Sequence, residues 1–273
     1  MENIHKIKLR DFEIGGDKLT VLAGPCAMES RDILFRTAEA LKKITAEIGV
    51  NFVFKCSYDK ANRSSLDSYR GLGIEKGLEL LAAAKKEFDV PIVTDFHSAE
   101  QAQMAAEVAD IIQVPAFLCR QTDLLVAAAK TGKIVNIKKG QFLSPYQMKS
   151  IAKKVSDSGN KDIVITDRGV SFGYNNLVSD MRAVPIIHEL GYPIIFDATH
   201  SVQLPGGGGT YTSGERKFVS TLAKSAVAAG ADGLFFEVHP NPDEALCDGP
   251  NQIDYKMAEE LIKICNDIFH LLK

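Results

Sequence analysis

The chain has 273 residues, of which 45% are hydrophobic and 25% are charged. This composition is typical of a globular protein and excludes a disordered or fibrous chain. The formal net charge of −3 creates no overall basic field, so no nucleic-acid partner is expected. No apolar run approaches the roughly 18 residues of a membrane helix, and the first residues lack the apolar stretch of a secretory signal, so no membrane partner is expected.

The predicted elements begin with a short hairpin and continue as alternating strands and helices. Residues 7–14, followed by Gly15-Gly16-Asp17, predict a β-hairpin within residues 1–17 that plugs the bottom of the fold. Eight short apolar runs predict buried strands. They cover residues 19–23, 52–54, 91–94, 111–114, 134–137, 163–166, 193–196 and 233–236. The segments between them have helical periodicity, and one helix is expected to be capped by Ser213 and to run to Ala229.

Strict alternation of apolar strands and helices predicts a parallel sheet that is covered on both faces. Eight such units in about 250 residues match a closed (β/α)8 TIM barrel, so we expect an α/β fold with one domain over residues 1–273. The alternative is a doubly wound open sheet. That fold would need a glycine-rich turn after the first strand, and the sequence has none there.

The five cysteines are odd in number and scattered along the chain. They are Cys26, Cys56, Cys119, Cys247 and Cys265. This pattern does not predict a disulfide framework, and it is typical of a protein of the reducing cytoplasm.

Polar residues follow nearly every predicted strand, where a barrel carries its chemistry. In chain order they are Cys26, Lys55, Asp95, Gln113, Lys138, Asp167, Arg168, Asp197, His200, Glu237 and His239. Burial of so many ionisable groups at one mouth is costly unless they pair with each other, with a metal or with a charged ligand. The sequence therefore predicts a functional rim at this end of the barrel.

The rim residues contain a cationic group and a group of possible metal ligands. Lys55, Lys60, Arg63, Lys138 and Arg168 would give the mouth a positive lining suited to phosphate and carboxylate. Together, Cys26, His200, Glu237 and Asp248 offer sulfur, nitrogen and oxygen donors suited to Fe2+, Zn2+, Mn2+ or Co2+. Their spacing follows no local ligand motif, and a cysteine after Gly-Pro is also typical of a small buried residue. The role of Cys247 stays open.

The segment from Pro205 to Thr210 contains four consecutive glycines. It lacks the Gly-Lys-Ser/Thr ending of a phosphate-binding loop, so a Walker motif is excluded. Such a run favours a mobile lid. We expect residues 204–213 and the tail beyond Leu246 to be the segments that close over the site.

Several stretches resemble the 3-deoxy-D-manno-octulosonate 8-phosphate synthase family. The resemblance extends from about Val21 to Asn251 and is carried by residues 22–26, 54–65, 94–95, 113–117, 136–141, 197–203 and 237–240. The most specific stretch is Lys60-Ala61-Asn62-Arg63-Ser64-Ser65. The Gly-Pro-Cys and Glu-Val-His-Pro pieces are shared with the wider superfamily.

The resemblance implies a (β/α)8 enzyme, usually a homotetramer, that condenses phosphoenolpyruvate with D-arabinose 5-phosphate and water. In Gram-negative bacteria the eight-carbon product feeds the inner core of lipopolysaccharide. Cys26 is typical of the metal-dependent members, whereas residues 247–251 look more like the metal-independent type.

The resemblance also implies roles for individual residues. Substrate contacts are expected from Lys55, Lys60, Asn62, Arg63, Ser64, Asp95, Gln113, Ala116, Phe117, Lys138, Arg168 and Gln203. Catalytic roles are expected for Lys60, Asp95, Lys138 and His200. In this scheme Lys138 and Arg168 hold the phosphate of phosphoenolpyruvate, and Arg63 with its neighbours grips the phosphate of the sugar.

Three other functions are compatible with the rim. The sister family, 3-deoxy-D-arabino-heptulosonate 7-phosphate synthase, acts on erythrose 4-phosphate and has Lys-Pro-Arg-Thr-Ser where this chain has Lys-Ala-Asn-Arg-Ser-Ser. A barrel that binds sugar phosphates without catalysis would release no phosphate. An aldolase that works through a Schiff base would use a buried lysine.

Overall fold

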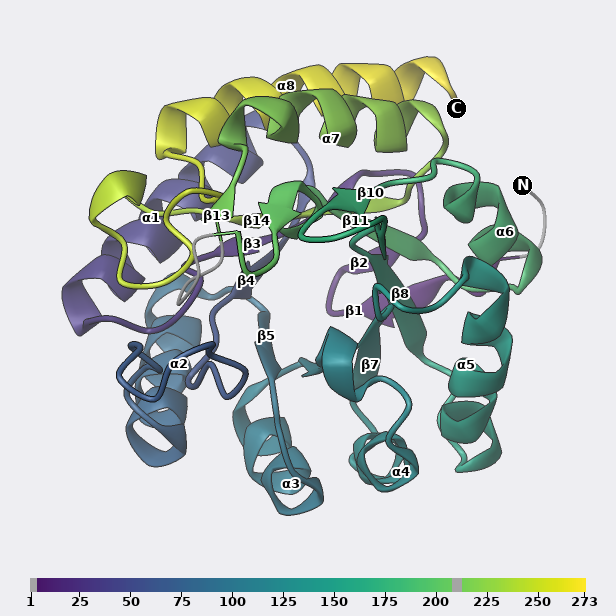
Figure 1. Ribbon diagram of the computed structural model, residues 1–273, viewed down its shortest axis with the longest axis horizontal. Helices are drawn as coiled ribbons and strands as arrows, with labels where there is room; N and C mark the ends of the chain where they lie inside the picture. Colours follow the sequence, from purple (N-terminus) through teal and green to yellow (C-terminus); the bar gives the residue numbers. More distant parts are fainter. Residues whose placement is uncertain (1–3, 208–212) are drawn as a thin grey trace.

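The computed structural model describes residues 4–207 and 213–273, and in it eight parallel strands close into a barrel (Figure 1). In chain order the strands are β3 (Thr20–Gly24), β4 (Asn51–Lys55), β5 (Ile92–Asp95), β6 (Ile111–Val114), β7 (Ile134–Lys138), β8 (Ile163–Asp167), β11 (Ile194–Asp197) and β14 (Gly233–Glu237). Pairing of β14 with β3 closes the ring. Each predicted run overlaps one of these strands, so the TIM barrel prediction is confirmed.

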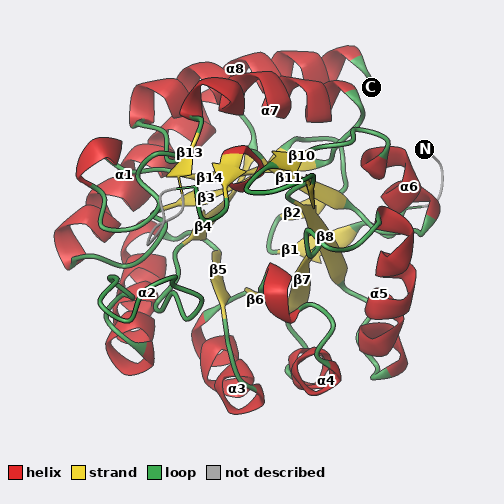
Figure 2. Cartoon of the chain, viewed as in Figure 1, coloured by secondary structure: helices red, strands yellow, loops and turns green. Residues whose placement is uncertain are grey.

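A helix follows each strand and covers the outside of the barrel (Figure 2). The helices are α1 (Arg31–Ile48), α2 (Ile74–Phe88), α3 (Ala99–Val108), α4 (Thr122–Lys130), α5 (Met148–Asp157), α6 (Ala183–Glu189), α7 (Val219–Ala228) and α8 (Tyr255–Leu271). Local sequence fixes several ends. Ser30 and Asp254 accept backbone N–H groups at the starts of α1 and α8, and Gly49 ends α1 in the left-handed region at φ 86°.

Every barrel strand is buried along its length because it faces two apolar layers. One layer lies between the strands and the helices. The other fills the inside of the barrel with Leu22, Val53, Val93, Ile111, Ile134, Val164, Ile195 and Phe235. This two-sided burial explains why the strands are continuous apolar runs in the sequence.

The N-terminal hairpin belongs to the inner layer. Its strands β1 (Ile7–Leu9) and β2 (Phe12–Ile14) pair antiparallel. Ile7, Leu9 and Ile14 are buried against the inward side chains of the barrel. The predicted hairpin is therefore present, and its apolar face fills the end of the barrel at which the strands begin. Residues 1–3 of the predicted 1–17 segment lie outside the described residues.

In the part of the chain that the structure describes, the loops also contain two small antiparallel hairpins and five 3-10 helices. The hairpins are β9 (Val170–Ser171) with β10 (Leu177–Val178) and β12 (Gln203–Leu204) with β13 (Ser213–Gly214). The 3-10 helices are η1 (Ala116–Leu118), η2 (Pro145–Gln147), η3 (His200–Val202), η4 (Arg216–Phe218) and η5 (Pro242–Glu244). The predicted cap at Ser213 was wrong, because Ser213 pairs with Leu204 in β13 and α7 starts only at Val219.

Part of the predicted lid, residues 208–212, lies outside the described residues. Among the helices of the described parts, none is long and apolar enough to cross a membrane.

Candidate active site

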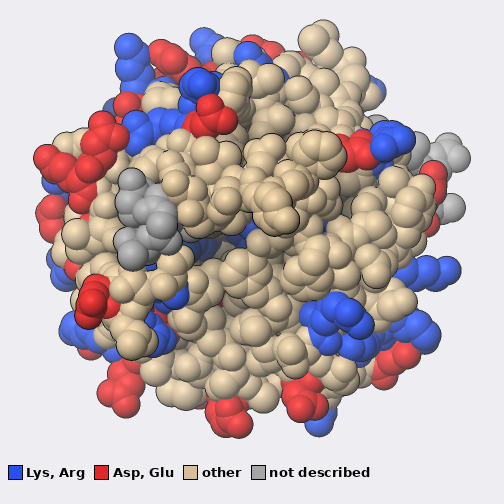
Figure 3. All heavy atoms as spheres, viewed as in Figure 1, with Lys and Arg blue, Asp and Glu red and all other residues tan. Residues whose placement is uncertain are grey.

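A cavity of about 520 Å3 opens at the end of the barrel where the strands finish. Its volume falls within the roughly 300–1,000 Å3 of small-molecule sites. Predicted site residues that line it are Lys60, Asn62, Arg63, Ser64, Asp95, Gln113, Ala116, Phe117, Lys138, Arg168, His200, Gln203 and Asp248. Lys and Arg atoms are visible inside the central hollow of Figure 3, which is rimmed mostly by uncharged residues. Thirteen of the predicted site residues thus line one cavity, whereas Cys26, Lys55 and Glu237 are not among its lining residues.

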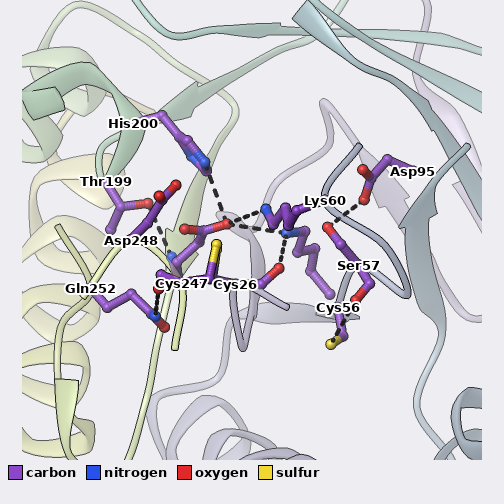
Figure 4. A network of polar contacts seen from close by, with 12 residues as sticks. Cys26, Cys56, Ser57, Lys60, Asp95, Thr199, His200, Cys247, Asp248 and Gln252 are labelled. Carbon is purple, nitrogen blue, oxygen red and sulfur yellow. Dashed lines mark hydrogen bonds and ion pairs between the residues drawn. The ribbon is translucent and has the colours of Figure 1, made fainter. Parts of the chain in front are cut away.

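Glu237, at the end of β14, is the centre of a buried charge network (Figure 4). Its Oε1 accepts from Lys55 Nζ at 3.2 Å and from Lys60 Nζ at 3.1 Å, and it lies 3.4 Å from His200 Nε2. Burial alone would raise the pKa of Glu237, but His200 and the two lysines hold it well below its usual value. Glu237 is therefore a carboxylate at neutral pH.

The two lysines of this network differ in their access to the cavity. The side chain of Lys55 is 1% exposed and does not line the cavity, since its Nζ also donates to the carbonyl of Cys26 at 3.2 Å. Lys60 does line the cavity. Burial would lower the pKa of Lys60, but Cys26 and Glu237 raise it well above its usual value. Lys60 thus presents a permanent cation to a ligand.

Lys138 and His200 share the carboxylate of Asp197. Lys138 Nζ donates to Asp197 Oδ2, and His200 Nδ1 lies 2.8 Å from the same oxygen. Burial lowers the pKa of Lys138 and of His200, and it would raise the pKa of Asp197, which these two residues instead hold well below its usual value. The Asp197 carboxylate thus orients Lys138, at the end of β7, and His200, in η3, and both line the cavity.

A second chain of contacts links Arg168 to Arg63 across the mouth. Arg168 donates to Gln203 Oε1, and Gln203 Nε2 donates to Asp248 Oδ2 at 3.0 Å. Arg63 donates to Asp248 Oδ1 at 3.0 Å. Burial would lower the pKa of Arg63, but Cys247 and Asp248 raise it. Asp248 thus contacts Arg63 directly and is linked to Arg168 through Gln203.

Asp95, at the end of β5, is held by Ser57 and His97. Ser57 Oγ donates to Asp95 Oδ1 at 2.5 Å, and His97 Nε2 lies 3.1 Å from Asp95 Oδ2. Burial would raise the pKa of Asp95, but His97, Lys55 and Lys60 hold it well below its usual value. The carboxylate can accept a hydroxyl hydrogen bond from a ligand in the cavity.

Possible metal ligands gather beside these charges. The ligand atoms of Cys26, Cys247 and Asp248 lie within 4.8 Å of one another, and so do those of His200, Glu237 and Asp248. The predicted ligands therefore form two neighbouring groups that share Asp248, and Cys247 belongs to the group that contains Cys26. Gly24, two residues before Cys26, allows the end of β3 to lie close to β4, because a Cβ there would lie 2.0 Å from the carbonyl oxygen of Lys55.

Comparison with known proteins identifies the family of the chain. The DAHP synthetase I family matches residues 4–273. A 2-dehydro-3-deoxyphosphooctonate aldolase of Geotalea uraniireducens is 52% identical over 271 residues, which is 99% of this chain and 100% of the relative. The chain belongs to this aldolase family. Proteins with the same name from Geobacter sp. (strain M21) and Fusobacterium nucleatum are 55% identical over 249 residues (91% of each chain) and 52% identical over 274 residues (100% and 99%).

Membership of the aldolase family confirms the resemblance found in the sequence, since 3-deoxy-D-manno-octulosonate 8-phosphate synthase is another name for it. The three relatives are named 2-dehydro-3-deoxyphosphooctonate aldolase. The alternative DAHP activity is named in the description of the wider family that matches the chain.

The structure of this family member also contains site residues to which the sequence assigned no role. Asp197 follows a predicted strand, and that position was its only signal. His97 and Gln141 line the cavity, but neither follows a strand directly. Gln141 Oε1 accepts from Arg168 at 2.8 Å, a contact between two loops that no local pattern predicts.

Proposed function

We propose that the chain condenses phosphoenolpyruvate with D-arabinose 5-phosphate and water to give 3-deoxy-D-manno-octulosonate 8-phosphate and inorganic phosphate. The observation that carries the proposal is the meeting of Lys60, Arg63, Lys138 and Arg168 around one 520 Å3 cavity. The two substrates together carry two phosphates and one carboxylate, which a cationic cavity is suited to bind. Such a product would serve synthesis of the lipopolysaccharide inner core.

Phosphoenolpyruvate would bind on the side of the cavity formed by β6, β7 and β8. Lys138 and Arg168 lie at or just beyond the ends of β7 and β8, and both line the cavity. Arg168 donates to amide and carbonyl oxygens, and within residues 4–207 and 213–273 no carboxylate pairs with it directly. Gln113, Ala116 and Phe117 would form the wall of this part.

The sugar phosphate would bind on the side formed by the loop after β4. Asn62, Arg63 and Ser64 line the cavity there. Without ligand, Arg63 is paired with Asp248, so we propose that it divides its donors between this carboxylate and the phosphate. Asp95 would accept a hydrogen bond from a sugar hydroxyl, which fixes the position of the aldehyde.

In the reaction, C3 of phosphoenolpyruvate forms a bond to the aldehyde carbon, and the aldehyde oxygen takes up a proton. Water adds to C2 and the C2–O bond to phosphate breaks. The water oxygen becomes the keto oxygen, and its two protons end on the former aldehyde oxygen and on the released inorganic phosphate. Lys60 would donate to the oxygen that becomes negative, and one such donor is worth about 3 to 4 kcal/mol. His200, whose Nδ1 lies 2.8 Å from Asp197, would help to position this water as a ligand of the metal proposed below.

We also propose a divalent metal held by Cys26, His200, Glu237 and Asp248. Their chemistry fits Fe2+, Zn2+, Mn2+ or Co2+. Glu237 Oε2 supports the proposal, because it is buried and lacks a hydrogen-bond partner among residues 4–207 and 213–273. When bound, the metal would position a substrate oxygen and make water easier to deprotonate.

The direct test is release of phosphate from phosphoenolpyruvate with each sugar, with and without a chelator. The proposal expects release with arabinose 5-phosphate and much less with erythrose 4-phosphate. Preference for erythrose 4-phosphate would establish the sister activity, and no release with either sugar would establish a binding protein. A borohydride-trapped adduct would establish Schiff-base chemistry instead.

We further propose a cytoplasmic homotetramer. Aromatic side chains on loops after three neighbouring strands are half exposed or more, which supports a covered surface. They are Phe117, Phe142, Tyr146, Phe172 and Tyr174. Light scattering after gel filtration would measure the mass, and a monomer at working concentrations would reject the tetramer.

A further inference from the structure

Two thiols from distant parts of the chain lie side by side at the active site. Cys26 follows β3, and Cys247, which is 221 residues further on, lies between η5 and α8. Both residues are 1% exposed, and their Sγ atoms are 3.0 Å apart. Figure 4 labels the two residues next to each other. Cys56, Cys119 and Cys265 are also buried, but these three are not in the clusters of possible metal ligands found in the described parts of the chain.

Cys247 belongs to the same group of possible metal ligands as Cys26. Its Sγ lies within 4.8 Å of Cys26 Sγ and of an Asp248 carboxylate oxygen. Asp248 in turn lies within the same distance of donor atoms on His200 and Glu237. A metal that reaches Cys26 and Asp248 therefore has a second sulfur in the same small volume.

The loop that carries Cys247 is held in place by specific contacts. Gln252 Nε2 donates to the carbonyl of Cys247 at 2.7 Å, and the N–H of Asn251 donates to the carbonyl of Asp248 at 2.9 Å. Asp248 itself is in the left-handed region at φ 49°, which non-glycine residues adopt only where surrounding contacts impose it. This backbone directs Cys247 and Asp248 toward the same site.

The pair of Cys26 and Cys247 needs positive charge nearby if both are thiolates. Two adjacent buried thiolates repel each other, and these two Sγ atoms are only 3.0 Å apart. Arg63 donates to Cys247 Sγ at 3.0 Å and supplies one positive charge on the outer side of the pair. A divalent cation on the inner side would supply the rest, and thiolates are strong ligands for it.

We propose that Cys247 is a second thiolate ligand of the metal centre, beside Cys26 and with His200 and the two carboxylates. This inference rests on the proposed metal. A centre with two thiolates selects a thiophilic ion such as Zn2+ or Fe2+ over Mn2+, because sulfur is a soft ligand. Arg63 then connects the metal centre to the part of the cavity proposed for the sugar phosphate.

Substitution of Co2+ into the metal-free protein tests the inference without an activity readout. The near-ultraviolet band that arises from charge transfer between thiolate and cobalt grows with the number of bound thiolates. We expect Cys26→Ser and Cys247→Ser each to lose about half of the band, and the double variant to lose all of it. Cys265→Ser, in α8, is the matched control and should keep the full band. An unchanged band in Cys247→Ser, with complete loss in Cys26→Ser, would overturn the inference.

A measurement on the wild-type protein covers the case in which a variant does not fold. X-ray absorption at the zinc edge should show two sulfur neighbours at about 2.3 Å, and one sulfur neighbour would overturn the inference. If the wild-type protein binds no metal, the metal proposal and this inference both fail, while phosphate release with arabinose 5-phosphate still tests the condensation separately.

Discussion

The two ends of the barrel are built from the same eight strands, yet they hold opposite kinds of residues. At the end where the strands begin, Ile7, Leu9 and Ile14 of the hairpin complete an apolar layer. At the end where they finish, the residues include Lys55, Lys138, Asp197 and Glu237, all of them buried. The first end gains stability from burial of apolar surface, whereas the second must offset the cost of desolvating its charges by pairing them.

This difference indicates where substitutions should affect stability and where they should affect chemistry. The cations at the mouth are paired with carboxylates but also line the cavity, where a bound anion can contact them. This arrangement serves ligand binding and not maximal stability. The hairpin touches none of them and should be replaceable without loss of catalysis.

The largest effect is expected for Lys138→Met. This change removes a proposed phosphate ligand, so kcat/KM should fall about 100- to 1,000-fold. It also leaves Asp197 buried without its lysine, which should cost about 3 to 5 kcal/mol of unfolding free energy. Chemical denaturation and steady-state kinetics measure the two effects. The exposed residue Lys149 provides the control, Lys149→Met.

The double variant Lys138→Met with Asp197→Asn separates the two effects. Stability should largely return, because the unpaired carboxylate is gone, while activity should stay low. Recovery of activity with stability would mean that Lys138 serves only the fold.

At the opposite end, Ile14→Ala should destabilise the protein by about 2 to 4 kcal/mol, because it opens a cavity under the inner layer. The kcat/KM of the folded protein at 25 °C should stay within a factor of two of wild type. Ile14→Val, which removes a single methylene group, should cost about 1 kcal/mol. If Ile14→Ala lost as much kcat/KM as Lys138→Met, the two ends of the barrel would not be independent.

Arg63→Ala should raise the KM for arabinose 5-phosphate about 10- to 100-fold, since hydrogen bonds to charged groups are worth about 1.5 to 3 kcal/mol. The KM for phosphoenolpyruvate should change far less. Arg182→Ala, which removes an exposed arginine paired with Asp180, is the control. Equal changes for both substrates would move Arg63 away from the sugar phosphate.

The smallest effect concerns pH. Burial would lower the pKa of His97, but Asp95 raises it. The stability that this pair contributes is therefore fully present below the ordinary histidine pKa of about 6.5, and it is lost as pH rises through the raised value. His97→Gln should cost about 1 to 2 kcal/mol near pH 6 and less near pH 9. A cost that grows with pH would mean that His97 is neutral beside Asp95.

The fold could be predicted because its signals are local. Two-sided burial makes each strand a continuous apolar run, and the run at residues 111–114 coincides with β6. The error at Ser213 has a physical cause. A serine can cap a helix or pair in a hairpin, and only its distant partner Leu204 decides between the two.

The site could be predicted in part because its signals are also local. The ends of parallel strands meet at one rim, so the sequence identified Lys60, Lys138 and Arg168 as neighbours of one cavity. It could not predict which charge pairs with which. Arg63 and Asp248 are 185 residues apart, and the contact between Cys26 and Cys247 depends on the conformations of two loops.

A crystal structure of the protein with phosphoenolpyruvate would test the central claim most directly. We predict the ligand inside the 520 Å3 cavity, with its phosphate within hydrogen-bond distance of Lys138 and Arg168 and with Arg63 free for the second substrate. A ligand bound elsewhere on the molecule, with the cavity filled only by solvent, would contradict the claim that this mouth gathers two small anions for condensation.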